Sequence, residues 1–366
     1  DQRIYHWDGD GNRESLSYVS SISPEFDYSK IGEAWSAPMI VAMPENNTRK
    51  WVAVFGAGYN GGVNSDYGSS IYVIDLEDKG KVLKRIDLTD VSSNIANSVP
   101  ASLVSITPDT TSKAKYKGSM LYVADLEGKQ WKLNLTNKGT LYEFTPIFDA
   151  QATVENDRME FFQITPTIGS DDNLWGYYGT GNQQKVQRVS TDINNRIFGL
   201  KDNNFPNYKN VNGLNNTAMS SLKNTTTPGS TCPGESDLGW YVNLEANERI
   251  TGKLALYNEI LYATRYLPNT NKMCAPGGAI LTEHGTACGY QTRKIELGEG
   301  IATGAVIYKG NIYLGVSGAG AADLKDEKGN VVGQKTDNII VITPNKTNSK
   351  VKGPVSVIQE SWREIF

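Results

Sequence analysis

The chain is poor in the residues that most often carry catalysis and metal binding. Among its 366 residues there are two histidines, His6 and His284, and three cysteines. The histidines lie far apart in the sequence, and neither has a cysteine or carboxylate at the spacing of a zinc site. A serine hydrolase elbow, Gly-x-Ser-x-Gly, is absent, as are phosphate-binding loops of the dinucleotide and Walker types. These absences argue against the commonest classes of enzyme.

Two further absences concern partners. No apolar run approaches the roughly 18 residues of a membrane-spanning helix, so no membrane insertion is expected. Acidic and basic residues are interspersed, with a formal net charge of −4, and no clustered basic face predicts nucleic-acid binding. Long amphipathic helical patterns are missing too. The chain begins at Asp1 without a visible signal peptide, so we expect a mature or trimmed form of a longer protein.

What the chain does have is a recurring type of strand. Ile71–Leu76, Leu121–Leu126 and, more weakly, Arg196–Asp202 are short apolar and aromatic runs closed by or close to an Asp. They are set roughly 50–75 residues apart, a spacing typical of radial all-β repeats. The 36 glycines are consistent with a fold of many tight turns.

Neighbouring apolar runs group with these strands into five units, most of them of four strands. The first three comprise Met39–Ala42, Trp51–Gly58, Ile71–Leu76 and Val82–Leu88; then Ser98–Pro100, Ser102–Ile106, Met120–Leu126 and Gln130–Leu135; then Ile164–Thr167, Leu174–Gly179 and Ile197–Leu200. The last two comprise Arg249–Leu256, Glu259–Tyr266, Ala279–Glu283 and Tyr290–Leu297; then Thr303–Tyr308, Asn311–Val316, Asn338–Ile342 and Val355–Trp362.

The predicted fold class is therefore all-β, a β-propeller of four-stranded antiparallel blades. Runs such as Val52–Phe55 are apolar on both faces, which fits sheets stacked between neighbouring blades; a β-sandwich is the rival. We expect residues 1–366 to form one propeller domain, or the C-terminal part of one whose N-terminal blades are missing. Residues 203–235 are polar and without apolar periodicity, and we expect a long surface insertion between the third and fourth units, either binding or disordered.

The sharpest metal signal is the alternation of oxygen-bearing side chains at Asp8, Asp10, Asn12 and Glu14. Ca²⁺ takes roughly six to eight oxygen ligands, and the interspersed glycines would let the loop curl around it. The pattern predicts a calcium site, with a plain Asp-Gly turn as the alternative. The weaker candidate, Asp323–Asn330, is better explained as a solvated hairpin tip.

The cysteines are Cys232, Cys274 and Cys288. Cys274 and Cys288 bracket a predicted hairpin with its turn at His284–Thr286, so a disulfide between them is the first expectation. Cys232, beside a Pro-Gly pair, is the alternative partner. The remaining alternative is that the three cysteines are unrelated buried thiols.

Two recurring features are interpreted as scaffold. Asp75 and Asp125 occupy equivalent places after their strands, where a carboxylate accepts backbone N–H bonds and caps a turn. Five tryptophans sit at strand starts or centres and are expected to pack between blades: Trp35, Trp51, Trp131, Trp175 and Trp240.

Several of these strings resemble the C-terminal β-propeller of the PilY/PilC family, which are type IV pilus tip-associated adhesins and biogenesis factors. The strings are Gly32–Pro38, Lys50–Asn60, Ile71–Leu76, Leu121–Leu135, Tyr178–Asn182, Gly239–Leu244 and Cys274–Gly278, and they follow the family's order. The resemblance covers most of the chain from about Ile31 onward. It implies a modified, quinoprotein-like propeller.

The resemblance also implies a non-enzymatic module, secreted through the periplasm and outer membrane to the pilus tip. Such a module would support pilus assembly, surface adhesion and twitching motility. Its implied partners are minor pilins, a host-cell or abiotic surface receptor, and an N-terminal von Willebrand A-like region of the same protein. Family members often carry a calcium loop in the propeller, but the matching segment Ile106–Gly118 has Asp109 as its single acid, so the calcium expectation rests on Asp8–Glu14.

Two other functions stay open at this point. Quinoprotein-type dehydrogenases are propellers with Trp-containing repeats, and such an enzyme would need Ca²⁺, an Asp base and a central cofactor pocket. A lectin-like carbohydrate binder would use the loop of residues 203–235.

Overall fold

The computed structural model describes residues 5–7, 13–15, 24–46, 48–63, 67–88, 94–107, 118–208, 219–270, 275–318 and 322–344. Five sheets of four or five strands dominate this part of the chain, and the hairpin β1 (Tyr5–Trp7)–β2 (Arg13–Ser15) forms a separate two-stranded sheet. Two short 3-10 helices accompany them, η1 (Pro24–Phe26) and η3 (Met219–Ser221).

We call the five sheets blades 1 to 5, in chain order. Blade 1 contains β3 (Met39–Glu45), β4 (Thr48–Gly56), β5 (Ser70–Asp75) and β6 (Lys81–Asp87); blade 2 contains β7 (Val104–Ile106), β8 (Gly118–Ala124), β9 (Lys129–Thr136) and β10 (Phe144–Asp149). Blade 3 contains β11 (Thr165–Ile168), β12 (Leu174–Gly179), β13 (Arg196–Asp202), β14 (Lys223–Asn224) and β15 (Gly239–Asn243). Blade 4 contains β16 (Arg249–Ile250), β17 (Ala255–Tyr257), β18 (Ile260–Leu267), β19 (Gly278–Gly285) and β20 (Gln291–Glu299). Blade 5 contains β21 (Val306–Tyr308), β22 (Asn311–Gly315), β23 (Ala322–Lys325), β24 (Val331–Thr336) and β25 (Ile339–Ile342).

Tight turns join two of the hairpins in blades 4 and 5. Asn258 and Glu259 both have positive φ, 50° and 61°, between β17 and β18, and Lys309 and Gly310 repeat this between β21 and β22. Two residues with positive φ match the twist of the flanking strands, so these pairs make compact hairpin corners. The hairpin corners predicted at Asn258 and Lys309–Gly310 are confirmed.

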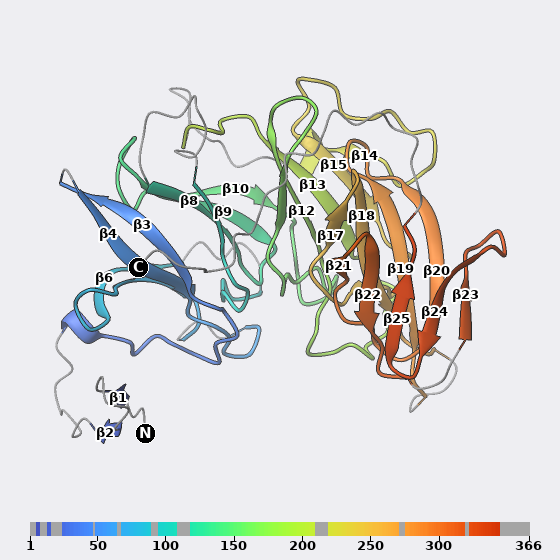
Figure 1. Cartoon of the computed structure of the whole chain (residues 1–366), viewed down its shortest axis with the longest axis horizontal. Helices are drawn as coiled ribbons and strands as arrows, with labels where there is room; N and C mark the ends of the chain where they lie inside the picture. The colour runs from blue at the N-terminus through green and yellow to red at the C-terminus, as the bar shows by residue number, and fades with distance from the viewer. Residues whose placement is uncertain are drawn as a thin grey trace.

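The blades stack face to face in chain order (Figure 1), and a separate apolar core fills each interface between neighbours. Each core draws residues from two blades: Val54 and Leu121 for blades 1 and 2, Tyr122 and Phe198 for blades 2 and 3, Ile197 and Leu261 for blades 3 and 4, Leu281 and Ile340 for blades 4 and 5. The inner blades are therefore apolar on both faces, as predicted from the sequence. Four-stranded antiparallel blades in an all-β fold are confirmed.

The two outermost blades each keep one face only partly covered. Ile40 and Trp51 are exposed on blade 1, and Val306 and Ile339 are exposed on blade 5. Among the described residues no apolar core joins blade 5 to blade 1, and Figure 1 places the two blades at opposite ends of the stack. The expectation that all five tryptophans pack between blades is wrong for two of them. Trp35 and Trp51 are about half exposed, whereas Trp131, Trp175 and Trp240 are buried.

Strand assignment was wrong in three blades. In blade 2 the fourth strand is β10, while Ser98–Pro100 contributes a single bridge from Val99 to Gly58. In blade 3 the fourth strand, which was not predicted, is β15. In blade 5 the hairpin β23–β24 comes before β25 in the chain but lies outside it in the sheet. The strand expected at Val355–Trp362 lies outside the described residues.

The polar insertion predicted between two units lies inside blade 3, between β13 and β15. After the insertion the chain returns to the sheet of blade 3, because Trp240 and Val242 of β15 fill the core against blade 4. The insertion also packs against its own blade: Tyr208, Leu222 and Thr225 are buried, and β14 pairs in parallel with β15.

Candidate functional site

The antiparallel strand order places one set of loops at the same end of every blade. In blades 1 to 3 these loops comprise residues 57–63, 94–103, 125–128, 150–164, 180–195 and 244–248, which we call the network rim. Backbone hydrogen bonds join each loop to the next: Gly58 N to Val99 O (3.0 Å), Leu126 N to Ser98 O (2.8 Å), Gly181 N to Met159 O (2.8 Å) and Leu244 N to Asn195 O (2.9 Å). Polar side chains on this rim are consequently held by backbone that is itself fixed.

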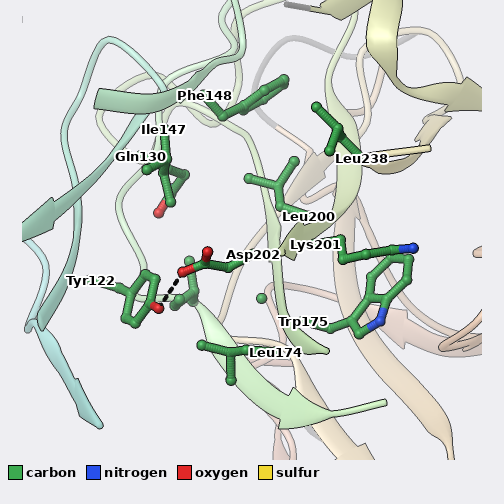
Figure 2. A pocket seen from close by; sticks show the side chains of 12 residues that line it. Tyr122, Gln130, Ile147, Phe148, Leu174, Trp175, Leu200, Lys201, Asp202 and Leu238 are labelled. Carbon is green, nitrogen blue, oxygen red and sulfur yellow. Dashed lines mark hydrogen bonds between the residues drawn. The ribbon is translucent and has the colours of Figure 1, made fainter. Parts of the chain in front are cut away.

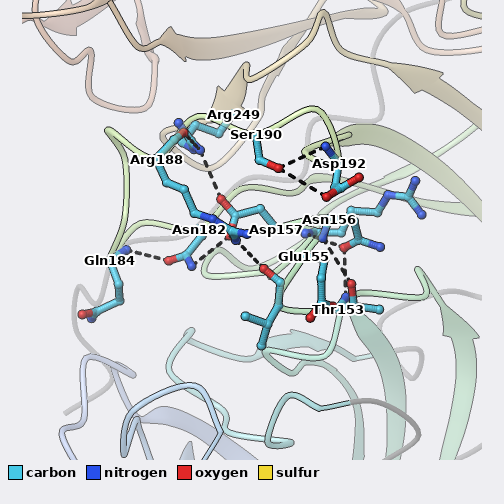
Figure 3. A network of polar contacts seen from close by, with 12 residues as sticks. Thr153, Glu155, Asn156, Asp157, Asn182, Gln184, Arg188, Ser190, Asp192 and Arg249 are labelled. Carbon is cyan, nitrogen blue, oxygen red and sulfur yellow. Dashed lines mark hydrogen bonds and ion pairs between the residues drawn. The ribbon is translucent and has the colours of Figure 1, made fainter. Parts of the chain in front are cut away.

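Asp157 is the centre of the most extensive polar network on the rim (Figure 3). Its buried carboxylate accepts hydrogen bonds from Asn182 Nδ2 (3.1 Å), Arg188 Nη1 (3.3 Å) and Arg249 Nη2 (3.1 Å). Asp157 has a φ of 61°, a left-handed conformation that Asp tolerates better than most residues. Three loops, from residues 150–164, 180–195 and the start of blade 4, therefore converge on one carboxylate.

Arg249 is fully buried; Nη1 donates to the main-chain oxygen of Val186, and Nη2 also donates to that of Arg188. Burial lowers the pKa of Arg249, and the ion pair with Asp157 opposes that shift. Removing a charge from such a pair would leave the other buried and unpaired. The network therefore acts as a clamp that holds the loop of residues 183–192, on which Gln184, Gln187 and Val189 are exposed.

A second buried polar cluster surrounds Asp125, directly after β8. Its carboxylate accepts hydrogen bonds from Lys129 N (3.0 Å), Trp131 Nε1 (2.8 Å) and Asn97 Nδ2 (3.0 Å). Glu127, which pairs with Lys129 at 3.2 Å, shares Asn97. The predicted turn-capping role of Asp125 is confirmed, as is that of Asp75, which accepts a bond from Glu77 N at 2.9 Å.

Glu160 adds a further carboxyl group to this buried region. One oxygen accepts a hydrogen bond from Gln130 Nε2, and Oε1 has no hydrogen-bond partner. Burial, together with the nearby Asp125, raises the pKa of Glu160 well above its ordinary value. Burial raises the pKa of Asp125 to about 7, against its three hydrogen bonds. Glu160 thus keeps its proton to a higher pH than an ordinary glutamate, and Asp125 titrates near neutrality.

Between blades 2 and 3 there is a small interior cavity (Figure 2). Its volume is about 30 Å³, enough for a water molecule or two and far below the roughly 300–1,000 Å³ of a typical ligand pocket. Asp202 lies on its wall and accepts hydrogen bonds from Tyr122 Oη (2.6 Å) and Lys132 Nζ (2.7 Å). Burial lowers the pKa of Lys132, and Asp202 opposes this shift. These groups satisfy one another within the core.

His284 is buried in blade 4. Its Nδ1 contacts Gly289 O (2.6 Å), and its Nε2 contacts Arg265 Nη2 (2.9 Å) and Thr282 Oγ1 (3.0 Å). Burial and the positive charge of Arg265 lower the pKa of His284 to about 3, so the ring is neutral at pH 7. This environment suits a structural histidine and provides no access for a substrate.

The predicted calcium residues fall where the structure gives no side-chain geometry. Asp8, Asp10 and Asn12 lie outside the described residues, and of Glu14 only the backbone is described, paired with His6 in the β1–β2 hairpin. Within the described part of the chain, no group of three or more His, Cys, Asp or Glu side chains is arranged to hold a metal ion.

Asp323–Asn330 includes the tip of the β23–β24 hairpin, as expected. There the half-buried Asp326 carboxylate accepts hydrogen bonds from Lys328 N (3.0 Å) and Asn330 N (2.9 Å). Both carboxylate oxygens accept hydrogen bonds from residues of the hairpin turn.

The disulfide links Cys232 to Cys288, with an S–S distance of 2.01 Å. The pairing first expected, Cys274 with Cys288, is therefore wrong, and the alternative partner is confirmed. Strand β19 explains why: it carries the chain from one end of blade 4 to the other before reaching Cys288, where the insertion of blade 3 arrives. Cys274 lies outside the described residues.

No protein-family model matches the chain. A sequence relative, the type IV pilus biogenesis factor PilY1 homolog of Xylella fastidiosa, is 22% identical over an alignment of 288 residues that covers 68% of this chain. The crystal structure of the Pseudomonas aeruginosa PilY1 C-terminal domain matches with a TM-score of 0.56 at 15% identity, covering 79% of this chain and 71% of that one. The resemblance to the PilY/PilC family is confirmed. The β-propeller prediction is confirmed with it.

This PilY1-like chain spans only 18% of the length of the Xylella relative. Quinohemoprotein alcohol dehydrogenase from Comamonas testosteroni also matches, at 11% identity over 82% of this chain and 48% of that one, but its TM-score of 0.39 is too low to bear on function. Within the described residues, no helix has the length and apolar character needed to cross a bilayer.

Proposed function

We propose that this chain is a non-enzymatic module of a type IV pilus biogenesis factor, displayed outside the cell at the pilus tip. The observation that carries the proposal is the sequence match to the PilY1 homolog over 288 residues. The propeller fold shared with the PilY1 C-terminal domain is consistent with it. In this proposal the module supports pilus assembly, surface adhesion and twitching motility, with minor pilins and an N-terminal von Willebrand A-like region as its partners.

The insertion of blade 3 is the surface we propose for contact with a receptor. It leaves and rejoins its sheet at the end of the blades opposite the network rim, and the Cys232–Cys288 bond fixes it to blade 4. Between these points it runs along the edge of blade 3, where Thr226 Oγ1 accepts a hydrogen bond from Asn243 N at 2.8 Å. Thr227, Pro228 and Gly229 are exposed at its tip, while Thr225 anchors its base. Loops held on a rigid scaffold are common binding sites, since little conformational entropy is lost on contact.

The test uses the bacterium that encodes the chain. One strain lacks the whole domain, and another lacks only residues 226–231 at the tip of the insertion. The first strain should assemble fewer surface pili and twitch over smaller zones; the second should keep both but adhere less. Normal pili, twitching and adhesion without the domain would overturn the proposal, whereas loss of adhesion only with the whole domain would move the contact surface elsewhere.

A quinoprotein-type dehydrogenase is the competing function. The described interior offers a cavity of about 30 Å³, too small for a quinone cofactor, and Asp125 and Asp202 are committed to structural hydrogen bonds. The purified protein is incubated with pyrroloquinoline quinone, Ca²⁺, an alcohol and a redox dye. We expect no turnover; sustained dye reduction would replace the non-enzymatic proposal.

Calcium binding at Asp8, Asp10, Asn12 and Glu14 is proposed on the sequence pattern alone. Calorimetric titration of the parent and of Asp10→Ala tests it. We expect binding in the parent that the variant loses, and equal heats in both would remove this loop from consideration.

A further inference from the structure

Two arginines near the start of β13 repel each other electrostatically, and no ion pair joins either of them to an acidic side chain of the described residues. Arg158 comes from the loop between β10 and β11, and Arg196 opens β13; both are half-buried. Arg158 Nε donates to Asn194 O at 2.6 Å. Arg196 Nε donates to Asn243 Oδ1 at 2.8 Å, and its guanidinium lies 4.6 Å from the centre of the Tyr241 ring. Both side chains are thus fixed in position through Nε and through packing.

The fully buried arginines of the described residues are neutralised. Each of them contacts a carboxylate: Arg249 contacts Asp157 (3.1 Å), Arg265 contacts Glu248 (3.0 Å), and Arg293 contacts Glu283. No carboxylate of the described residues forms an ion pair with Arg158 or Arg196. Instead, burial and repulsion by Arg196 lower the pKa of Arg158 to about 10. Charged side chains seldom leave water without a counter-charge, so the uncompensated pair is unusual.

The arginines also keep hydrogen-bond donors available. Among the described residues, the terminal nitrogens Nη1 and Nη2 of Arg158 have no hydrogen-bond acceptor, and neither has Nη2 of Arg196, whose Nη1 contacts Met219 Sδ at 3.4 Å. The Nη1–Nη2 edge of a guanidinium matches the two oxygens of a carboxylate or of a phosphate. Partial burial strengthens such a contact, because the effective dielectric constant is lower than in water.

We propose that Arg158 and Arg196 form a binding site for an oxyanion, the carboxylate or phosphate group of a ligand. The terminal nitrogens of Arg158 bind two oxygens of this group, and Arg196 supplies the second positive charge. This site lies where β13 begins and borders the insertion of blade 3, because Arg196 Nη1 contacts Met219 Sδ. This proposal goes beyond the pilus function and is tested on the purified protein. Either proposal can therefore fail while the other stands.

The experiment measures thermal unfolding and calorimetric binding with three sodium salts at equal ionic strength: glucuronate, phosphate and chloride. In the parent, glucuronate or phosphate should raise the melting temperature saturably above the value in chloride, as expected for a ligand that binds the folded state. Arg158→Gln should weaken that binding by about tenfold or more, because a charged hydrogen-bonding group is lost. Arg49→Gln, an exposed arginine on β4, is the matched control and should bind as the parent does.

The outcomes separate the ligand sources and the alternatives. A response to glucuronate alone identifies a carboxylate site, and a response to phosphate alone identifies a phosphate site. Arg158→Gln should be as stable as the parent in chloride, since the change removes repulsion with Arg196; a purely structural role would lower stability in all three salts. Arg158→Lys keeps the charge without the paired donors and should bind weakly while folding normally. No saturable effect in the parent, or an equal effect in Arg158→Gln, overturns the proposal.

Discussion

Glu160→Gln is the most informative perturbation of the buried acidic region. The raised pKa of Glu160 means that the folded protein keeps a proton there which the unfolded chain loses once the pH exceeds the ordinary glutamate pKa. The stabilisation from this group is complete at low pH and is lost as the pH rises toward the folded-state pKa. Glutamine has the shape of a protonated glutamate and does not ionise, so the variant removes this pH dependence without emptying the site.

The magnitude follows from linkage. Each proton kept by the folded state alone lowers the free energy of unfolding by about 1.4 kcal/mol per pH unit. Asp125, whose pKa rises from 3.8 to about 7, contributes a second such slope up to about pH 7. Over the pH range in which the folded state keeps both protons and the unfolded chain has lost them, the parent should lose about 2.7 kcal/mol per pH unit and Glu160→Gln about half as much. The difference between the two proteins should stop growing at the pH where folded Glu160 ionises.

Urea unfolding followed by tryptophan fluorescence, repeated across this pH range, provides the measurement. The difference between parent and variant is the quantity of interest, since titrating groups that do not interact with Glu160 contribute equally to both. The control is Glu155→Gln, an exposed glutamate whose lowered pKa keeps it ionised throughout the range, so its curve should run parallel to that of the parent. Parallel curves for the parent and Glu160→Gln would refute the assignment of Glu160 as a buried neutral acid.

Three further changes test other parts of the fold. Asp157→Asn leaves Arg249 buried without its counter-charge and should lower the free energy of unfolding by about 3–5 kcal/mol in urea titrations; a loss below about 1 kcal/mol would contradict the clamp. Cys288→Ser opens a loop of 56 residues and should cost about 4 kcal/mol at most, seen as a lower melting temperature that reducing agent no longer changes; an unchanged melting temperature would count against a stabilising bond. Gly199→Ala places a methyl group 2.4 Å from the buried ring of Trp240 and should destabilise by about 1–3 kcal/mol by calorimetry, and a neutral result would show that the blade 3–blade 4 interface is looser than described.

The sequence predicted the fold best where strands carry apolar residues on both faces. Blade 1 follows the predicted strands closely, and its hairpin β3–β4 turns within two residues. Blade 4 follows them apart from Arg249–Leu256, which is divided into β16 and β17. The fourth strands of blades 2 and 3 were missed for different reasons. β10 contains Pro146 and is only half-buried, so its pattern is weak. β15 is apolar, but the insertion separates it from its sheet neighbour β13, and local periodicity does not report which strands pair across such a distance.

The polar networks were largely invisible to sequence reasoning. Asp125 was predicted as a cap because it repeats the place of Asp75, and such repetition is a local signal. Asp157 and Arg249 are 92 residues apart, and nothing in either neighbourhood reports their contact. Glu160 does have a local sequence signal. It is an isolated acid between the apolar residues Met159 and Phe161, which marks a candidate for a raised pKa.

The disulfide determines how mechanical load would pass through the molecule. Without it, a force applied to the tip of the blade 3 insertion would act on β14 and β15 alone and break their hydrogen bonds one after another. Because Cys232 is bonded to Cys288, the same pull reaches the turn between β19 and β20 and is divided between two blades whose shared core must shear as a unit. The insertion is therefore a two-point attachment, and its resistance to traction should depend on the oxidation state of a single bond.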